Sequence, residues 1–411
     1  MEKAQRRIGV ILVGLVCIWC CFTNNAGADL SAATLKVPKL PSADLRQLTT
    51  GDYQCWNGDW SRDGKWIVYQ RQKNTNSSLS DIYRIGVDGT GETQLTSGYY
   101  CDSKPQFSPN GKKIVFQRNM TPEGGTKVGE KASIWVMDAD GSNQTQLVAP
   151  GPEDKEGAQW PFWSPDGKLI AYKYGERNKK GLWIVKADGT GPQQLIATDF
   201  GEDPEKFMDW KPKGVGKGKQ MVVSVQNDTP KSPTSRHPGR TYSRHLLLAE
   251  FDPKGLTPAK NTWLTDPENP SCVSNAKWKP DGKRIAYMDD SNNYGDICLM
   301  NPDGTDKVRL TDSASNGNAC YSNPNWSPNG KYIVYWSTEG LPASSSPWAK
   351  KRIYIMTADG AYKNCLMSDE NVRENHRGGY LLHFNRAGTK ILFGGHGPSD
   401  KVHLFVLDLH K

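Results

Sequence analysis

The sequence predicts an all-β fold, a seven-bladed β-propeller of four-stranded antiparallel blades. Two observations predict it: a short motif recurs seven times, and the last repeat lacks a strand that residues near the start can supply. One four-stranded sheet cannot bury both of its faces, whereas sheets stacked radially around an axis cover one another. The repeat therefore has to be analysed before any single motif.

The repeated motif is an aromatic residue followed by a tight turn, as in Trp326-Ser-Pro-Asn-Gly-Lys331. Proline presets φ for such a turn, and glycine accepts a positive φ. An apolar run follows each turn, then a variable loop, a second apolar run that usually ends in Asp-Gly, and a short last strand such as TQLT. The aromatic residues of the seven units are Trp60, Phe107, Trp163, Trp210, Trp278, Trp326 and Phe384.

The seventh unit ends after its third strand. Its missing fourth strand has a counterpart near the start, where Leu45-Arg-Gln-Leu-Thr49 resembles the last strands of the other units. We expect this segment to pair with the final hairpin and close the ring, because closure removes exposed sheet edges. The expected propeller then spans residues 44–411. An open array of sheets is the alternative.

These motifs resemble the TolB-like propeller repeat, a relative of the WD-type repeats, over about residues 45–409. The resemblance implies the propeller fold and, since that family works in the cell envelope with protein partners, a binding or scaffold role. About 16 residues separate the expected mature N-terminus from the closing strand. We therefore expect this chain to lack the small α/β domain that precedes the propeller in TolB.

The first 28 residues are typical of a secretory signal peptide. Lys3, Arg6 and Arg7 make a basic start, residues 8–22 are apolar but too few to span a bilayer, and Ala26-Gly-Ala28 is a small-residue cleavage signature. Residues 29–43 would form an N-terminal extension. We expect a periplasmic or secreted monomer with no transmembrane segment after signal removal.

The net charge is +8 at pH 7, of which the first 28 residues contribute +2. This mildly basic balance favours a solvated positive surface, or an acidic glycan partner, over nucleic acid. The sequence has no GxSxG elbow, P-loop or dinucleotide fingerprint. For a binding protein we expect no cofactor, and the sequence identifies no metal ligands.

Four cysteines lie shortly before their blade aromatics: Cys55, Cys101, Cys272 and Cys320. Neighbouring blades should bring such loops side by side, and export permits oxidation. We therefore expect the disulfides Cys55–Cys101 and Cys272–Cys320. Metal binding by these thiols is the alternative, although no CxxC pair supports it.

Loops on a rigid scaffold often carry function, and the loops that vary in length share one face and the channel mouth of the expected propeller. Candidate catalytic residues there can bind carboxylates or transfer protons: His237, Arg240, Tyr242, His376, Arg377 and His396. Candidate ligand-binding residues are aromatic, for stacking on sugars or anchoring a protein: Trp56, Tyr100, Trp160, Tyr321, Trp348 and Tyr380. The ordinary alternatives are solvated loops and packing between blades.

Two functions stay open. The first is a non-catalytic exported propeller that binds a cell-envelope protein or an acidic glycan. The second is based on a resemblance to the oligogalacturonate-lyase-like propellers. The blade count, the expected export and the loops rich in His and Arg are similar to those of that family. The resemblance implies a polysaccharide lyase that cleaves uronate-containing glycans by β-elimination, with a divalent metal assisting. The closely spaced metal-binding histidines of that family have no clear match in this sequence.

Overall fold

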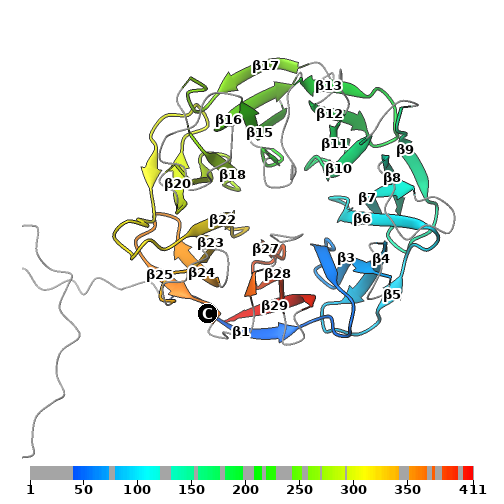
Figure 1. Cartoon of the computed structure of the whole chain (residues 1–411), viewed down its shortest axis with the longest axis horizontal. Coiled ribbons are helices and arrows are strands. Elements are labelled where there is room, and N and C mark those ends of the chain that lie inside the picture. Colours follow the sequence, from blue (N-terminus) through cyan, green and yellow to red (C-terminus); the bar gives the residue numbers. More distant parts are fainter. Residues whose placement is uncertain are drawn as a thin grey trace, which may run out of the picture. The chain divides into compact units, whose positions relative to one another are not determined.

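Seven antiparallel sheets stand around a common axis, as the repeat predicts (Figure 1). The computed structural model describes residues 40–73, 79–120, 131–151, 156–175, 181–197, 208–214, 219–227, 243–251, 258–268, 271–291, 294–341, 351–367, 373–374, 382–396 and 401–410. Over these ranges the chain forms strands and turns and no α-helix. No helix capable of crossing a membrane occurs in them. The predicted seven-bladed propeller is confirmed.

Six blades each take four strands in chain order. Blades 1 to 3 contain β2 Cys55–Trp60, β3 Trp66–Gln72, β4 Ser80–Gly86, β5 Thr93–Gln94, β6 Tyr100–Phe107, β7 Lys113–Met120, β8 Ala132–Asp138, β9 Thr145–Val148, β10 Ala158–Trp163, β11 Leu169–Tyr174, β12 Gly181–Lys186 and β13 Gln193–Ile196. Blades 4 to 6 contain β14 Met208–Trp210, β15 Lys219–Asn227, β16 Ser243–Phe251, β17 Pro258–Trp263, β18 Val273–Trp278, β19 Ile285–Asp289, β20 Asp296–Met300, β21 Val308–Arg309, β22 Tyr321–Trp326, β23 Tyr332–Ser337, β24 Arg352–Thr357 and β25 Lys363–Cys365.

Blade 7 joins the two ends of the propeller. Its strands are β26 Arg373–Glu374, β27 Leu382–Phe384, β28 Lys390–His396, β29 Val402–His410 and, from the start of the chain, β1 Ser42–Gln47. β1 pairs antiparallel with β29, so that Leu45 lies opposite Leu407. Just beyond β1, the Leu48 N–H donates to the Leu404 carbonyl at 2.8 Å. The predicted closure of the ring by this segment is therefore confirmed.

The recurring turn follows from side-chain hydrogen bonds within the motif. In blade 1 the Ser61 hydroxyl donates to the Asp63 carboxylate at 2.6 Å, and the same carboxylate accepts the Lys65 N–H at 3.1 Å. Gly64 provides the positive φ of 70°. Equivalent serine–acceptor pairs close three other turns: Ser108–Asn110, Ser164–Asp166 and Ser327–Asn329. The motif is thus accounted for by turn formation.

The core is divided among the blade interfaces. The described residues contain seven buried apolar clusters, one for each pair of neighbouring blades. Between blades 6 and 7, for example, the fully buried Trp336 packs edge-on against Phe393 with ring centroids 5.7 Å apart. Each sheet is therefore covered on both faces by its neighbours, which is why the ring needs no other layer.

The expected disulfides are not formed, since all six cysteines of the described chain are thiols. Cys55 is buried in the cluster between blades 7 and 1, whereas the Cys101 sulfur lies 3.3 Å from the Ser80 hydroxyl, between blades 1 and 2. The whole sheet of blade 1 separates them. Packed sheets lie about 10 Å apart, beyond the ~7 Å limit between Cα atoms joined by a disulfide. Burial also raises the pKa of the Cys55 thiol to about 12.

The second expected pair fails for the same reason. An isolated backbone β-bridge joins Cys272 to Arg244 at the boundary of blades 4 and 5. Cys320 precedes Tyr321, which packs in the cluster between blades 5 and 6. Because the four cysteines occupy equivalent positions in their repeats, each lies at the interface between its own blade and the preceding one. One whole sheet therefore separates it from the cysteine of the next blade.

Candidate functional site: the central channel

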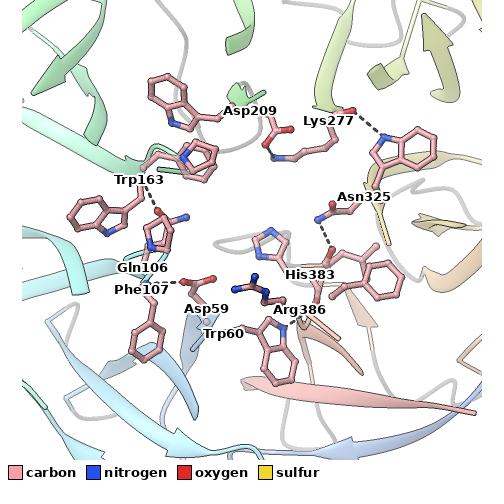
Figure 2. A pocket seen from close by; sticks show the side chains of 18 of the residues that line it. Asp59, Trp60, Gln106, Phe107, Trp163, Asp209, Lys277, Asn325, His383 and Arg386 are labelled. Carbon is pink, nitrogen blue, oxygen red and sulfur yellow. Dashed lines mark hydrogen bonds and ion pairs between the residues drawn. The ribbon is translucent and has the colours of Figure 1, made fainter. Parts of the chain in front are cut away.

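The innermost strands of the seven blades enclose a cavity of about 610 Å³ along the propeller axis (Figure 2). These strands are β2, β6, β10, β14, β18, β22 and β27. Each contributes side chains at fixed positions relative to its blade aromatic. We call the positions three residues before it the bulge ring, one residue before it the middle ring, and two residues after it the turn ring.

The bulge ring is made by left-handed residues. In five blades the residue three before the aromatic has φ between 51° and 56°, and the strand pairing shifts register there. These residues are Asn57, Lys104, Trp160, Asn275 and Asn323. Asparagine tolerates this conformation, but lysine and tryptophan rarely adopt it. A bulge redirects side chains, and here it turns the residue at this position towards the axis.

Lys104 and Trp160 both adopt this strained conformation, and their side chains contact each other. The Lys104 ammonium lies 3.3 Å from the centroid of the Trp160 ring and donates to the Asn57 side-chain oxygen at 3.2 Å. The Trp160 N–H donates to the Gln117 side chain at 3.1 Å. Strained backbone that the surroundings hold in place is concentrated at functional sites. This pair is therefore the part of the bulge ring that points to ligand binding.

The strain at Trp160 leads to a testable expectation. We expect Trp160→Asn to leave the free energy of unfolding within about 1 kcal/mol of wild type, because relief of about 1–3 kcal/mol of backbone strain offsets the lost cation–π contact and buried area. The matched control is Trp163→Asn, where loss of a buried indole should cost about 3–5 kcal/mol. Urea unfolding measures both. Equal losses for the two variants would contradict a strained Trp160.

Most of the middle ring forms a structural girdle. In three blades its side chain accepts the backbone N–H of the next blade's aromatic residue, at 2.7 to 2.8 Å: Asp59 from Phe107, Gln106 from Trp163 and Asp209 from Trp278. In blade 6 the Asn325 amide donates to the Leu382 carbonyl at 2.9 Å. These residues join neighbouring blades, so their polar character has a structural explanation.

Two middle-ring residues are cations or bases directed into the cavity. The Lys277 ammonium lies 3.9 Å from the Asp209 carboxylate. Burial raises the pKa of Asp209, and Lys277 partly offsets that rise. The half-buried imidazole of His383 also points into the cavity (Figure 2). Burial, and then the nearby charge of Lys277, lowers the pKa of His383 to about 4, so this ring is neutral at pH 7.

The turn ring carries arginine in two adjacent blades. Five blades have proline at this position: Pro109, Pro165, Pro212, Pro280 and Pro328. Blades 1 and 7 have Arg62 and Arg386 instead. Arg62 donates to the Pro109 carbonyl at 2.9 Å. With Lys104 and Lys277, the cavity has four cationic side chains against the two carboxylates Asp59 and Asp209, which favours an anionic ligand.

The four ligand-binding candidates in the described part of the chain differ in burial and in their contacts. Trp160 lines the cavity. Tyr100 is half-buried, with the Arg118 guanidinium 4.4 Å above its ring. Tyr321 is fully buried and donates to Glu339 at 3.1 Å. Trp56 is half-buried, and its indole nitrogen is buried with no hydrogen-bond partner among the described residues.

Of the catalytic candidates, only His396 lies in the described chain, half-buried at the end of β28. The remaining candidates fall outside the described residues: His237, Arg240, Tyr242, Trp348, His376, Arg377 and Tyr380. In the ranges that are described, no group of three or more His, Cys, Asp or Glu side chains is arranged to hold a metal ion.

The sequence contained signals for the channel that the loop-based hypothesis did not use. Aligning the repeats on their aromatics shows Arg62 and Arg386 where the other units have proline. The same alignment shows Lys104 and Trp160 where three other units have asparagine. His383 occupies the column of Asp59 and Asn325. All five of these departures from the repeat line the channel.

Comparison with known proteins gives partial matches. No protein-family model matches the chain. An uncharacterized protein of Agrobacterium fabrum is 32% identical over 130 residues, which are 31% of this chain and 42% of the relative. The Tol-Pal system protein TolB of Rhizorhabdus wittichii is 36% identical over 81 residues, 20% of this chain and 16% of the relative. The chain thus spans less than half the length of these curated relatives.

Among solved structures, an oligogalacturonate lyase from Vibrio parahaemolyticus superposes with a TM-score of 0.58 and 11% identity. The match covers 89% of this chain and 97% of the lyase. At this identity the match shows a shared fold.

Proposed function

We propose that this β-propeller, which is similar in part of its sequence to the Tol-Pal system protein TolB, is a non-catalytic binding or scaffold protein of the cell envelope whose ligand occupies the central channel. The observation that carries the proposal is the strained Lys104–Trp160 pair at the bulge ring, 3.3 Å from ammonium to ring centroid. A scaffold that only needed to close its ring would keep asparagine there, as three other blades do. The excess of cations in the cavity favours an acidic protein segment or an acidic glycan.

Photocrosslinking tests where the ligand binds. Replacing the channel residue Phe162 with a photoreactive benzoyl-phenylalanine should capture a defined envelope component, and Trp160→Asn in the same chain should reduce its yield. The control places the same group at Tyr362, which is 36% exposed and lies outside the cavity. Capture only at position 362, or none at position 162, would contradict binding in the channel.

One observation favours a second candidate, a lyase acting on uronate-containing glycans. Arg386 and the neutral imidazole of His383 share one cavity, and such a pair suits neutralising a carboxylate and abstracting the adjacent proton. The assay is the absorbance of the unsaturated product after incubation with pectic, ulvan and alginate oligomers, with and without divalent metal. Turnover that is lost in His383→Asn would establish the lyase and overturn the non-catalytic proposal. Absence of turnover on all three substrates would remove the lyase.

A further inference from the structure

One sector of the channel gathers groups suited to an anion. Lys277 from blade 5 and His383 from blade 7 belong to the middle ring, and Arg386 of blade 7 belongs to the turn ring. All three side chains point into the cavity (Figure 2). Asn325 of blade 6, between them in chain order, has its amide committed to the Leu382 carbonyl. The charged or titratable side chains that this sector presents to the cavity are therefore Lys277, His383 and Arg386, beside the bulge-ring amides of Asn275 and Asn323.

We propose that Lys277, His383 and Arg386 form an anion subsite that binds the carboxylate of an acidic oligosaccharide and takes up a proton on His383 as it does so. The proposal deepens the binding function above and rests on it. Of its two ligand classes, the surroundings favour the glycan. The cavity presents amide side chains that match sugar hydroxyls, with the Trp160 and Phe162 rings beside them.

The proton linkage follows from the groups around His383. Lys277 on β18 and Arg386 after β27 are cationic, whereas Asp209 on β14 and Asp59 on β2 are acidic. Asp59 accepts the Phe107 N–H and Asp209 accepts the Trp278 N–H, so both carboxylates are engaged in the girdle. Lys104 on β6 is held at Trp160 and Asn57. Among the described residues, burial and then the charge of Lys277 outweigh these carboxylates, so the imidazolium is disfavoured when no ligand is bound.

A bound carboxylate reverses this balance. Its negative charge beside the imidazole raises the pKa of His383 from about 4. Between the unliganded and liganded pKa values, binding takes up a proton, so affinity rises as pH falls from 7 towards 5. Each unit of that rise in pKa corresponds to about tenfold in affinity. Below about pH 4 the gain ends, because the ligand carboxylate itself becomes protonated.

Calorimetry with trigalacturonate tests the subsite directly. We expect binding about tenfold tighter at pH 5 than at pH 7, with proton uptake detected by comparing buffers of different ionisation enthalpy. The fully methyl-esterified trimer has the same rings without the charge, and its binding should not depend on pH. Lys277→Met and Arg386→Met should each weaken binding of the acid roughly tenfold or more. His383→Asn should abolish the tightening, so that its affinity for the acid is the same at pH 5 as at pH 7.

Two comparisons make the test specific. Lys283→Met removes an exposed lysine from the same blade, outside the cavity, and should leave affinity unchanged. Arg386 is exposed, so its variant should fold even if a change at His383 does not. Affinity that is independent of pH, or that is insensitive to Arg386→Met, would overturn the subsite and leave ligand capture in the channel intact. Tighter binding of triglutamate than of trigalacturonate would overturn the glycan assignment, as would no binding of the sugar acid.

Discussion

Replacing Asp102 with alanine should lower the free energy of unfolding by about 3–5 kcal/mol, the cost of leaving a buried charge unpaired. Asp102 on β6 is fully buried and accepts two hydrogen bonds of 2.7 Å from the Arg118 guanidinium on β7. The Arg118 side chain is 6% exposed. Aromatic rings surround it, with Tyr100 at 4.4 Å and Trp135 at 4.6 Å from the guanidinium carbon. Removal of the carboxylate leaves that cation without a counter-charge, among these rings and the neutral Gln144 side-chain oxygen at 3.0 Å.

A double variant separates charge burial from packing. Asp102→Leu with Arg118→Met removes both charges and keeps apolar volume, so it should regain most of the stability that Asp102→Ala loses. Urea unfolding followed by tryptophan fluorescence measures each variant, since the chain has 14 tryptophans. If Asp102→Ala cost less than about 1 kcal/mol, the value typical of a surface pair, the pair would not be buried as described.

Introducing charges into the closing strand should destabilise the propeller by a comparable amount. Leu48 is 6% exposed in the cluster between blades 7 and 1, and Leu45 packs against the cluster between blades 6 and 7. Loss of both leucines in Leu45→Asp/Leu48→Asp removes about 3–6 kcal/mol of apolar burial, before the cost of burying carboxylates. We expect the thermal midpoint to fall by more than 10 °C, on the order that this loss predicts.

The control variant introduces a negative charge on the same strand, β1, without removing a buried leucine. Ser42→Asp adds a carboxylate at an exposed position of β1, and the thermal midpoint should stay close to that of wild type. Hydrogen exchange distinguishes local from global effects: in the double variant, the amides of β29 opposite β1 should lose protection first. Unchanged protection there would mean that β1 does not close the ring.

The fold was predictable because its determinants are local and repeated. Ser61, Asp63 and Gly64 close their turn with their own side chains and backbone, so the motif is visible without tertiary information. The closing strand was recognisable because Leu45-Arg-Gln-Leu-Thr49 matches the sequence pattern of the outer strands in other blades. Both predictions depended on short-range chemistry and on counting repeats.

The site was less predictable because it depends on side-chain direction. Strand alternation assigns faces with a period of two, and the left-handed residues of the bulge ring break that period. Nothing in single-strand alternation indicates that Lys104 and Trp160 turn towards the axis. The disulfide prediction was misled in a related way, since Cys55 and Cys101 are neighbours in the repeat but lie on opposite sides of one sheet.

The two arginines of the turn ring flank the seam where the first and last blades meet. An anion that contacted both Arg62 and Arg386 would link two parts of the chain that are more than three hundred residues apart in sequence. Occupancy and ring integrity would then be thermodynamically coupled, because whatever binds only the closed ring stabilises it. The propeller would be most resistant to opening when its channel is filled.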